Sequence, residues 1–329
     1  MVRRGRHEGA LRFESAFRDL VVAHQRELRA YCYRMAGSLA AADDLLQESL
    51  LRAWRALPGF EGRSSFRTWL YRVVFSACVD ALESKPLRRL SIEHGTPADP
   101  HDPLLAPEPD AFVEPCSPAL YDGTPQAPDA RYGVRESVAL AFLEALQLLP
   151  ARQRAMLIAR DVLGLSAQEC SELFDVSVAS ANSALQWARE TVDTRADRWR
   201  EAPPPDAPTR ELLARYVRAW ENADVGALLV LLREDATLAM PPLPLWLRGP
   251  DAIGASVGAM VFRAEARGLF RLIATEANSL PAFAAYRRTT AGAYEPVALH
   301  LVETREARIS AITALLAPTL FTRLELPSP

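Results

Sequence analysis

Residues 177–189 carry side chains of the types that contact DNA. Hydroxyl and amide groups can hydrogen bond to base edges or phosphates in a major groove, and arginine can bind phosphate. The candidates are Ser177, Ser180, Asn182, Ser183, Gln186 and Arg189. Serine and asparagine are also common on ordinary surface helices, so that alternative stays open. Residues 136–200 hold seven basic and nine acidic residues, a net charge of −2. Isolated DNA-binding domains are usually basic, so a partner that recruits this block to DNA would explain its charge.

Residues 63–72 interleave cations with aromatic rings. Rings can stack on unpaired bases, and arginine can contact the nucleic-acid backbone. The candidates are Arg63, Phe66, Arg67, Trp69, Tyr71 and Arg72. Phe66 and Trp69 can equally belong to a hydrophobic core.

An acidic cluster, residues 43–48, forms a third candidate surface. Asp44 and Glu48 are four residues apart, so they share one face of a helix. Such a face is either simply solvated or a docking site for a basic partner. Acid–base chemistry is a further use of paired carboxylates, but no histidine or metal-ligand pattern accompanies these two.

Three amphipathic helices are predicted to position the N-terminal candidates. Apolar residues at spacings of three or four indicate helices at about 13–36, 39–57 and 65–84. Gly37 and Pro58-Gly59 suit the stops between them. Three helices with short loops predict one compact helical domain.

Ten prolines interrupt residues 85–135. Proline fixes φ and lacks a donor N–H, so this stretch cannot form a long helix or a central strand. Residues 91–135 also hold eight acidic and two basic residues, which predicts an acidic, extended linker. Four apolar side chains in it could dock on a neighbouring surface. They are Phe112, Val113, Leu120 and Tyr121.

Helical periodicity returns at Val138, with a break at Pro150. Ser166 and Glu169 have the spacing of a capping box, and Ser177 can cap a second helix to about residue 191. Two helices joined by a tight turn are the helix-turn-helix pattern. The residues expected to face inward are Ala167, Leu173, Val178 and Leu185.

Residues 206–329 change character again. Helices are indicated at about 209–222, 224–233 and 250–258, followed or separated by strand-like segments. The strand-like segments are 236–240, 269–276, 282–289, 296–304 and 309–316. Helices followed by an antiparallel sheet predict an α+β domain.

The composition of the 329-residue chain excludes several classes of protein. No apolar run approaches the ~18 residues of a membrane span, and the N-terminus lacks the apolar segment of a secretory signal. The four cysteines form no CxxC pair, which argues against a zinc site or a disulfide framework. We expect a cytoplasmic protein of two or three domains, without a metal or other cofactor.

Two stretches resemble bacterial extracytoplasmic-function (ECF) sigma factors of the sigma-70 family. ADDLLQESLLRAWRALPGFEGRSSFRTWLYRVV resembles their region 2, and LQLLPARQRAMLIARDVLGLSAQECSELFDVSVASANSALQWAR resembles their region 4. The third block, with LLARYVRAWENADVGALLVLLREDATLAMPPLPLWLRGPDAI, is similar to a subgroup with a SnoaL-like domain. The resemblance implies region 2 at 10–88, a linker at 89–135, region 4 at 136–200 and the SnoaL-like domain at 206–329. The implied fold is two all-α sigma domains followed by an α+β cone-shaped barrel.

The resemblance also implies roles for single residues. Asp43, Asp44, Leu46, Gln47 and Glu48 match the helix that docks on the β′ clamp helices of RNA polymerase core. Residues matching the part that melts and recognises the minus-10 element are Arg63, Ser65, Phe66, Arg67, Trp69, Arg72 and Ser76. Residues 177–189 match the minus-35 recognition helix. Ser76 stands where the family usually has asparagine, and Trp187 where arginine is common, so promoter affinity and sequence preference are expected to differ.

The SnoaL-like domain is expected to tune the sigma domains, with or without a small-molecule ligand. Barrels of this kind can hold an apolar pocket with a few polar groups. Candidate lining residues are Tyr216, Trp220, Met240, Trp246, Phe262 and Tyr286, with Arg248 or Arg287 as a polar anchor. Each aromatic residue can equally be core packing. The apolar loop Met240–Trp246 is predicted to line the pocket mouth or an interdomain contact.

Two other functions remain open from the sequence. One is a SnoaL-type enzyme or ligand sensor fused to a DNA-binding regulator, although His300 lacks an evident catalytic partner. The other is a repressor that binds DNA without polymerase. The resemblance favours a sigma factor that is not itself an enzyme and whose partners are RNA polymerase core and promoter DNA.

Overall fold

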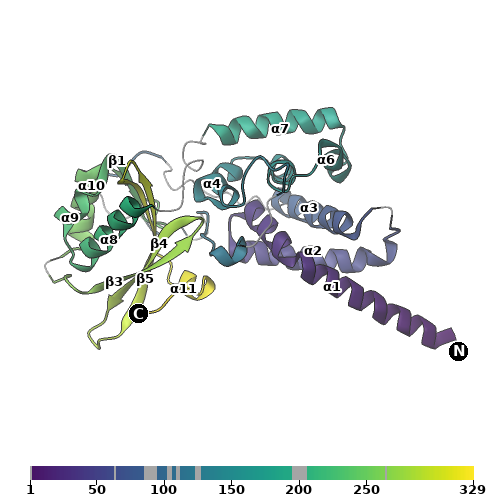
Figure 1. Cartoon of the computed structure of the whole chain (residues 1–329), viewed down its shortest axis with the longest axis horizontal. Coiled ribbons are helices and arrows are strands. Elements are labelled where there is room, and N and C mark those ends of the chain that lie inside the picture. Colours follow the sequence, from purple (N-terminus) through teal and green to yellow (C-terminus); the bar gives the residue numbers. More distant parts are fainter. Residues whose placement is uncertain are drawn as a thin grey trace. The chain divides into compact units, whose positions relative to one another are not determined.

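The chain folds into two compact units, each described here by itself. One unit comprises residues 1–88 and 119–198, and the other comprises residues 89–118 and 199–329 (Figure 1). The computed structural model describes residues 2–62, 64–84, 95–101, 106–108, 112–122, 127–194, 206–263 and 265–329. Within these residues, none of the helices combines the length and the apolar character that crossing a membrane requires.

Helices α1 (Val2–Ala36), α2 (Leu39–Ala56) and α3 (Phe66–Ser84) form the first half of the helical unit. Gly37 has a φ of 68°, which lets the chain reverse after α1, and the Ser38 hydroxyl then caps α2 by accepting from the Ala41 N–H at 3.3 Å. The predicted helices are confirmed, but α1 begins eleven residues earlier than its apolar spacing indicated. The added segment is polar and basic and carries no apolar stripe, so periodicity could not detect it.

Helices α4 (Leu140–Gln147) and α5 (Ala151–Leu157) are separated at Pro150, as predicted. A π-helical turn, η4 (Ile158–Val162), continues α5. The helix-turn-helix follows as α6 (Ala167–Phe174) and α7 (Val178–Asp193).

Both capping interactions predicted for the helix-turn-helix are present. Ser166 and Glu169 form the capping box, and Ser177 accepts from the Ser180 N–H. Asp175 takes a left-handed conformation, φ 52°, in the turn between the helices. The prediction that Val178 faces inward is wrong: its side chain is exposed, and Ala181 one turn later is buried instead.

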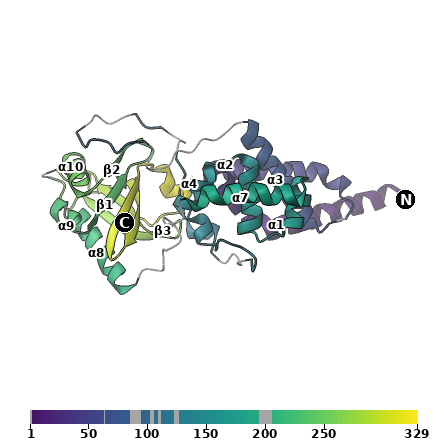
Figure 2. The same ribbon diagram turned by 90° about the horizontal axis from the view of Figure 1, so that it is seen from above.

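A six-stranded sheet with the order β2-β1-β6-β5-β4-β3 forms the second unit. Helices α8 (Ala207–Glu221), α9 (Val225–Leu229) and α10 (Pro250–Met260) lie on one side of the strands in both views (Figures 1 and 2). The strands are β1 (Leu232–Ala239), β2 (Trp246–Arg248), β3 (Phe270–Ala277), β4 (Leu280–Arg288), β5 (Tyr294–Arg305) and β6 (Arg308–Leu315).

The prediction of a wholly antiparallel sheet is wrong, because β1 pairs with β6 in parallel. This pairing joins strands about 75 residues apart in the chain, and nothing local in the sequence encodes its direction. Strand β2 and helix α11 (Thr319–Arg323) were not predicted. Three and five residues are too few to show a hydrophobic period.

The described residues between 95 and 118, here called the strap, pack on the sheet unit. The Ala98 N–H donates to the Trp246 carbonyl at 2.8 Å. At the β3–β4 turn, Asn278 holds Cys116 through three hydrogen bonds: backbone to backbone (3.1 Å), Cys116 N–H to Asn278 Oδ1 (2.9 Å) and Asn278 Nδ2 to Cys116 Sγ (3.5 Å). Phe112 and Val113 are buried, as the docking prediction required.

Candidate polymerase- and promoter-binding surfaces

The acidic cluster forms an exposed face on α2. Asp43, Asp44, Gln47 and Glu48 are exposed, whereas Leu46 is buried and anchors the helix from its opposite side. Arg29 donates two hydrogen bonds to Asp43 (2.6 and 2.9 Å), and Arg52 donates one to Glu48 (3.0 Å).

Those cations partly neutralise the two ends of the face. Asp44 enters no ion pair within the part of the chain that the structure describes, so its carboxylate is the group most available to a basic partner. The geometry therefore offers a docking face with Asp44 near its centre.

Three aromatic side chains gather at the start of α3. Ring centroids are 5.4 Å apart for Phe66 and Trp69, and 5.2 Å apart for Phe60 and Trp69. Phe66 and Trp69 are half-buried, so they support the fold and still present an edge to solvent. Ser65 caps the helix by accepting from the Thr68 N–H at 3.1 Å. Arg63 lies outside the described residues.

The cations of this segment already have partners in the free protein. Arg67 donates to Glu27 at 2.8 Å and lies over the Tyr71 ring, 4.8 Å from its centroid. Arg72 donates to the Glu172 carbonyl of α6 at 3.1 Å. Ser76 is exposed about one turn further along the helix.

Helix α7, the predicted recognition helix, presents a polar face to solvent. Ser180, Asn182, Ser183 and Gln186 are exposed, together with Trp187. Its opposite face is buried through Ala181, Leu185, Ala188 and Val192.

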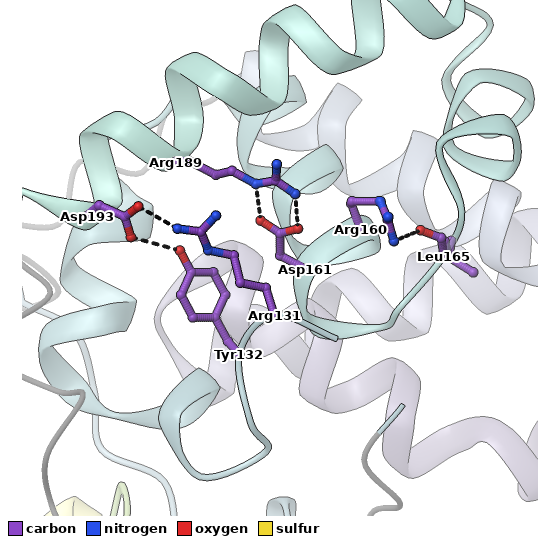
Figure 3. Close-up of polar contacts among 7 residues, drawn as sticks. All are labelled: Arg131, Tyr132, Arg160, Asp161, Leu165, Arg189 and Asp193. Carbon is purple, nitrogen blue, oxygen red and sulfur yellow. Dashed lines mark hydrogen bonds and ion pairs between the residues drawn. The ribbon is translucent and has the colours of Figure 1, made fainter. Parts of the chain in front are cut away.

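Arg189, the cation predicted to contact the minus-35 DNA, is engaged within the protein (Figure 3). Its guanidinium forms two parallel hydrogen bonds with the Asp161 carboxylate, at 2.7 and 2.5 Å. Asp161 lies on the π-helical turn and its side chain is only 2% exposed. The pairing raises the pKa of Arg189 through hydrogen bonding to Asp161. Arg189 thus fixes α7 to the preceding turn.

The end of α7 is held by residues from before α4. Arg131 donates to Asp193 at 2.7 Å, and the Tyr132 hydroxyl donates to the same carboxylate at 3.3 Å (Figure 3). The Tyr132 N–H also donates to the Asp161 carbonyl at 2.9 Å. Burial raises the pKa of Tyr132 to about 12, so it stays protonated and acts as a donor.

A buried polar junction joins α1–α3 to α4–α7 within the helical unit. Arg34 on α1 donates to the Ser137 carbonyl (3.1 Å) and hydroxyl (2.8 Å). Arg154 on α5 donates to the Met35 carbonyl and to Gln147 and Leu149. Burial lowers the pKa of Arg154 to about 10, so it remains cationic at neutral pH. The Phe75 and Phe174 rings stack beside this junction, with centroids 6.0 Å apart.

The candidate pocket residues of the sheet unit do not come together as one lining. Tyr216, Trp220, Met240 and Phe262 share the main core. Tyr286 lies in a separate cluster with Phe321 and donates to the Pro327 carbonyl. Arg248 and Arg287 are both exposed, so the prediction of a polar anchor inside the barrel is wrong for both residues.

Trp246, at the end of the loop 240–246, is buried, and its carbonyl accepts from the Ala98 N–H of the strap. The Arg248 guanidinium lies 5.0 Å from the centroid of the Trp246 ring. The Tyr216 hydroxyl and His300 Nδ1 are 2.9 Å apart in the interior. Burial lowers the pKa of His300 to about 3, so the imidazole is neutral near pH 7. No cluster of metal ligands occurs in the described ranges.

Several residues that organise these surfaces escaped the sequence reasoning. Asp161, Arg131, Tyr132 and Arg154 were not singled out. Arg154 directly precedes the apolar run Ala155–Ala159, but arginine is mostly exposed in proteins, so its burial was not predictable from residue type. The partners of the others are distant in sequence and leave no local pattern.

Family models for Sigma-70 region 2 and Sigma-70 region 4 match residues 20–86 and 139–192. The ECF RNA polymerase sigma factor SigG of Mycobacterium tuberculosis is 41% identical over 309 residues, covering 92% of this chain and 82% of the relative. The chain belongs to the ECF RNA polymerase sigma factor family. The RNA polymerase sigma-H factor of Pseudomonas aeruginosa is 29% identical over 178 residues, covering 54% of the chain and 84% of that protein.

The crystal structure of the Mycobacterium tuberculosis ECF sigma factor SigJ has the same overall fold. It aligns with a TM-score of 0.59 and 21% identity, covering 93% of this chain and 98% of that one. The second unit of this sigma factor is an α+β domain, with helices α8 to α10 and a six-stranded sheet. As an ECF sigma factor, the protein binds RNA polymerase and directs promoter-specific initiation of transcription. A sigma factor is not itself an enzyme.

Proposed function

We propose that α2, α3 and α7 divide the work of initiation among three surfaces. The α2 face centred on Asp44 binds the β′ clamp helices of core polymerase. The start of α3 binds the melted minus-10 strand, with Phe66, Trp69 and Arg72 as its contacts. Helix α7 binds the minus-35 duplex. One observation carries this assignment: on α2 the polar candidates are exposed around the buried Leu46, and on α7 they are exposed opposite a buried stripe of Ala181, Leu185, Ala188 and Val192.

The proposal assigns different physical roles within each surface. Leu46 and Arg189 are positioning residues, because one is buried and the other is ion-paired to Asp161. Asp43, Gln47 and Glu48 surround Asp44 on the polymerase face. Arg67, Ser65 and Ser76 flank the α3 rings, and Ser177 shapes the start of α7 as its cap.

We further propose that the SnoaL-like domain regulates initiation through the strap and does not catalyse a reaction. The strap lies in the chain between the two sigma regions, so its attachment to the sheet domain links that domain to both. The interior supports a non-catalytic role, since His300 is a weak base there and large rings surround it.

Transcription in vitro with bacterial core polymerase tests the assignment. The full chain should direct initiation from promoters selected out of a random library, and Asp44→Lys should reduce initiation at limiting sigma factor in proportion to its weaker binding to core polymerase. Glu83→Lys, at an exposed acid near the end of α3, is the matched control. Turnover of a small molecule by the full chain would contradict the non-catalytic role of the SnoaL-like domain.

A further inference from the structure

We propose that Trp187 is a promoter contact and that α7 binds the minus-35 duplex through a surface whose one cation, Arg189, is held in an ion pair. The inference rests on the proposed function, because it takes α7 as the duplex-binding helix. Trp187 then replaces a cation as the group that fixes α7 against the sugar–phosphate backbone.

Exposure of the Trp187 ring is the first observation. It is 67% exposed, a larger fraction than any other large hydrophobic side chain that the structure describes. A ring left in water gains by being covered, and Trp is among the side chains most often found at the centre of binding surfaces.

The direction of the ring is the second observation. The buried stripe of α7 runs through Ala181, Leu185 and Ala188. At about 100° per residue, Ser183 and Glu190 project opposite to that stripe, and Trp187 projects about 50° from that direction. Trp187 therefore lies on the face that carries the proposed DNA contacts and is continuous with it.

Charge is the third observation. Arg189 is the sole cationic residue of the sequence 178–193, and its Nε and Nη2 groups are held by the Asp161 carboxylate, which offsets its charge. Glu190 lies on the exposed face and accepts from Gln186 at 3.3 Å. The helix thus meets a polyanion with its one cation already ion-paired. The indole of Trp187 can supply a phosphate contact without a charge. Its Nε1–H donates to a phosphate oxygen while its ring packs on deoxyribose.

The position of Trp187 along the helix agrees with that contact. In a helix-turn-helix, the first residues of the recognition helix meet the base edges. Trp187 comes nine residues after Val178, or about 13 Å along the helix axis. Trp187 therefore lies beyond the residues at the helix start that meet base edges, where contacts to the backbone are expected.

A neutral contact has a measurable consequence. Each cation that binds a phosphate releases counterions and steepens the dependence of log K on log salt by about 0.9. Loss of Trp187 should weaken binding without changing that slope, and an arginine in its place should steepen it.

The experiment uses holoenzyme assembled from the full chain and bacterial core polymerase. Promoter duplexes are first selected from a library randomised at the upstream element. Binding is then measured over a range of salt on a selected duplex and on the same duplex truncated between the two elements. Trp187→Ala, Trp187→Arg and the control Leu148→Ala, an exposed apolar residue of region 4 at the end of α4, are compared with the wild type.

We expect Trp187→Ala to bind the complete duplex about tenfold more weakly, the truncated duplex unchanged, and the salt slope to stay constant. Trp187→Arg should restore affinity at low salt with a slope steeper by about 0.9. Leu148→Ala should match the wild type. Equal losses on both duplexes, or a loss in holoenzyme assembly, would identify a polymerase contact and overturn the inference. So would wild-type affinity of Trp187→Ala on the complete duplex. If the wild type itself does not distinguish the two duplexes, the assignment of α7 fails instead.

Discussion

The Asp161–Arg189 pair should respond unequally to the loss of its two members. Asp161 is 2% exposed, whereas the Arg189 side chain is 33% exposed. Arg189→Ala leaves a carboxylate buried and unpaired, and breaking a buried pair in this way costs about 3–5 kcal/mol. Because the vacated space opens to solvent, we expect the lower end, about 3 kcal/mol. Asp161→Ala leaves a guanidinium that can turn into water, so we expect about 1 kcal/mol.

The double variant decides whether this reasoning is correct. With both charges removed, no unpaired carboxylate remains, so Asp161→Ala/Arg189→Ala should be more stable than Arg189→Ala alone. Arg189→Lys should fall between the wild type and Arg189→Ala, since an ammonium cannot form the two parallel bonds.

Hydrogen exchange of the α7 amides in the full chain is the suitable assay, because the pair acts locally on that helix. A loss of about 3 kcal/mol corresponds to roughly a hundredfold faster exchange. Equal effects of the two single substitutions, adding in the double variant, would show that the pair is not coupled. Arg189 would then have to be reconsidered as a direct DNA contact.

Three further predictions concern the other surfaces. Asp44→Lys should weaken core polymerase binding about tenfold in a direct affinity measurement, while Glu83→Lys binds normally; equal losses would point to net charge alone. Asn278→Gly keeps the positive φ of 50° but deletes two hydrogen bonds to Cys116, so exchange of the Cys116 amide should accelerate about tenfold. The control Ala307→Gly, at a φ of 56°, should leave the strap protected. Finally, the folded pKa of His300 is about 3 against 6.5 for an unperturbed histidine, so the unfolded chain binds the extra proton between those values. Stability of the sheet domain should therefore rise with pH from about 3 to 6.5, by at most about 1.4 kcal/mol per pH unit from this group, and His300→Leu should flatten that rise in urea titrations.

Local features of the fold were open to prediction from the sequence. The capping box at Ser166 and Glu169 depends on a spacing of three residues, and the break at Pro150 depends on one side chain. Both features depend only on residues close together in the sequence, and both occur as predicted. The exposed face of α2 followed equally from residues within one turn of each other.

Pairings between distant residues were not open to prediction. The parallel β1–β6 pair and the contact of Cys116 with Asn278 depend on how whole segments pack. For the same reason, the sequence placed Arg189 on the DNA face. The residue type was compatible with phosphate binding, but Asp161, 28 positions earlier, holds its guanidinium. The inward placement of Val178 failed because the first turn of a helix can project beyond the core that later turns cover.

The buried junction inside the helical unit limits what the free sigma factor can do on a promoter. Elements centred at minus 10 and minus 35 are about 25 base pairs apart, or about 85 Å of duplex at 3.4 Å per base pair. Here Arg72 of α3 donates to the Glu172 carbonyl of α6, and the Phe75 and Phe174 rings stack 6.0 Å apart. Only a three-residue turn separates α6 from α7.

Because α3 contacts α6 and α7 follows α6 after three residues, the α3 and α7 surfaces lie much closer together than the two promoter elements. Engagement of both elements at once requires α3 and α6 to separate, which breaks the hydrogen bond from the already exposed Arg72 to Glu172 and frees the guanidinium for the DNA strand. The act of spanning the promoter and the act of freeing an arginine for it are then the same movement. Polymerase, by holding the α3 and α7 surfaces apart, would set the spacing between promoter elements that the sigma factor can accept.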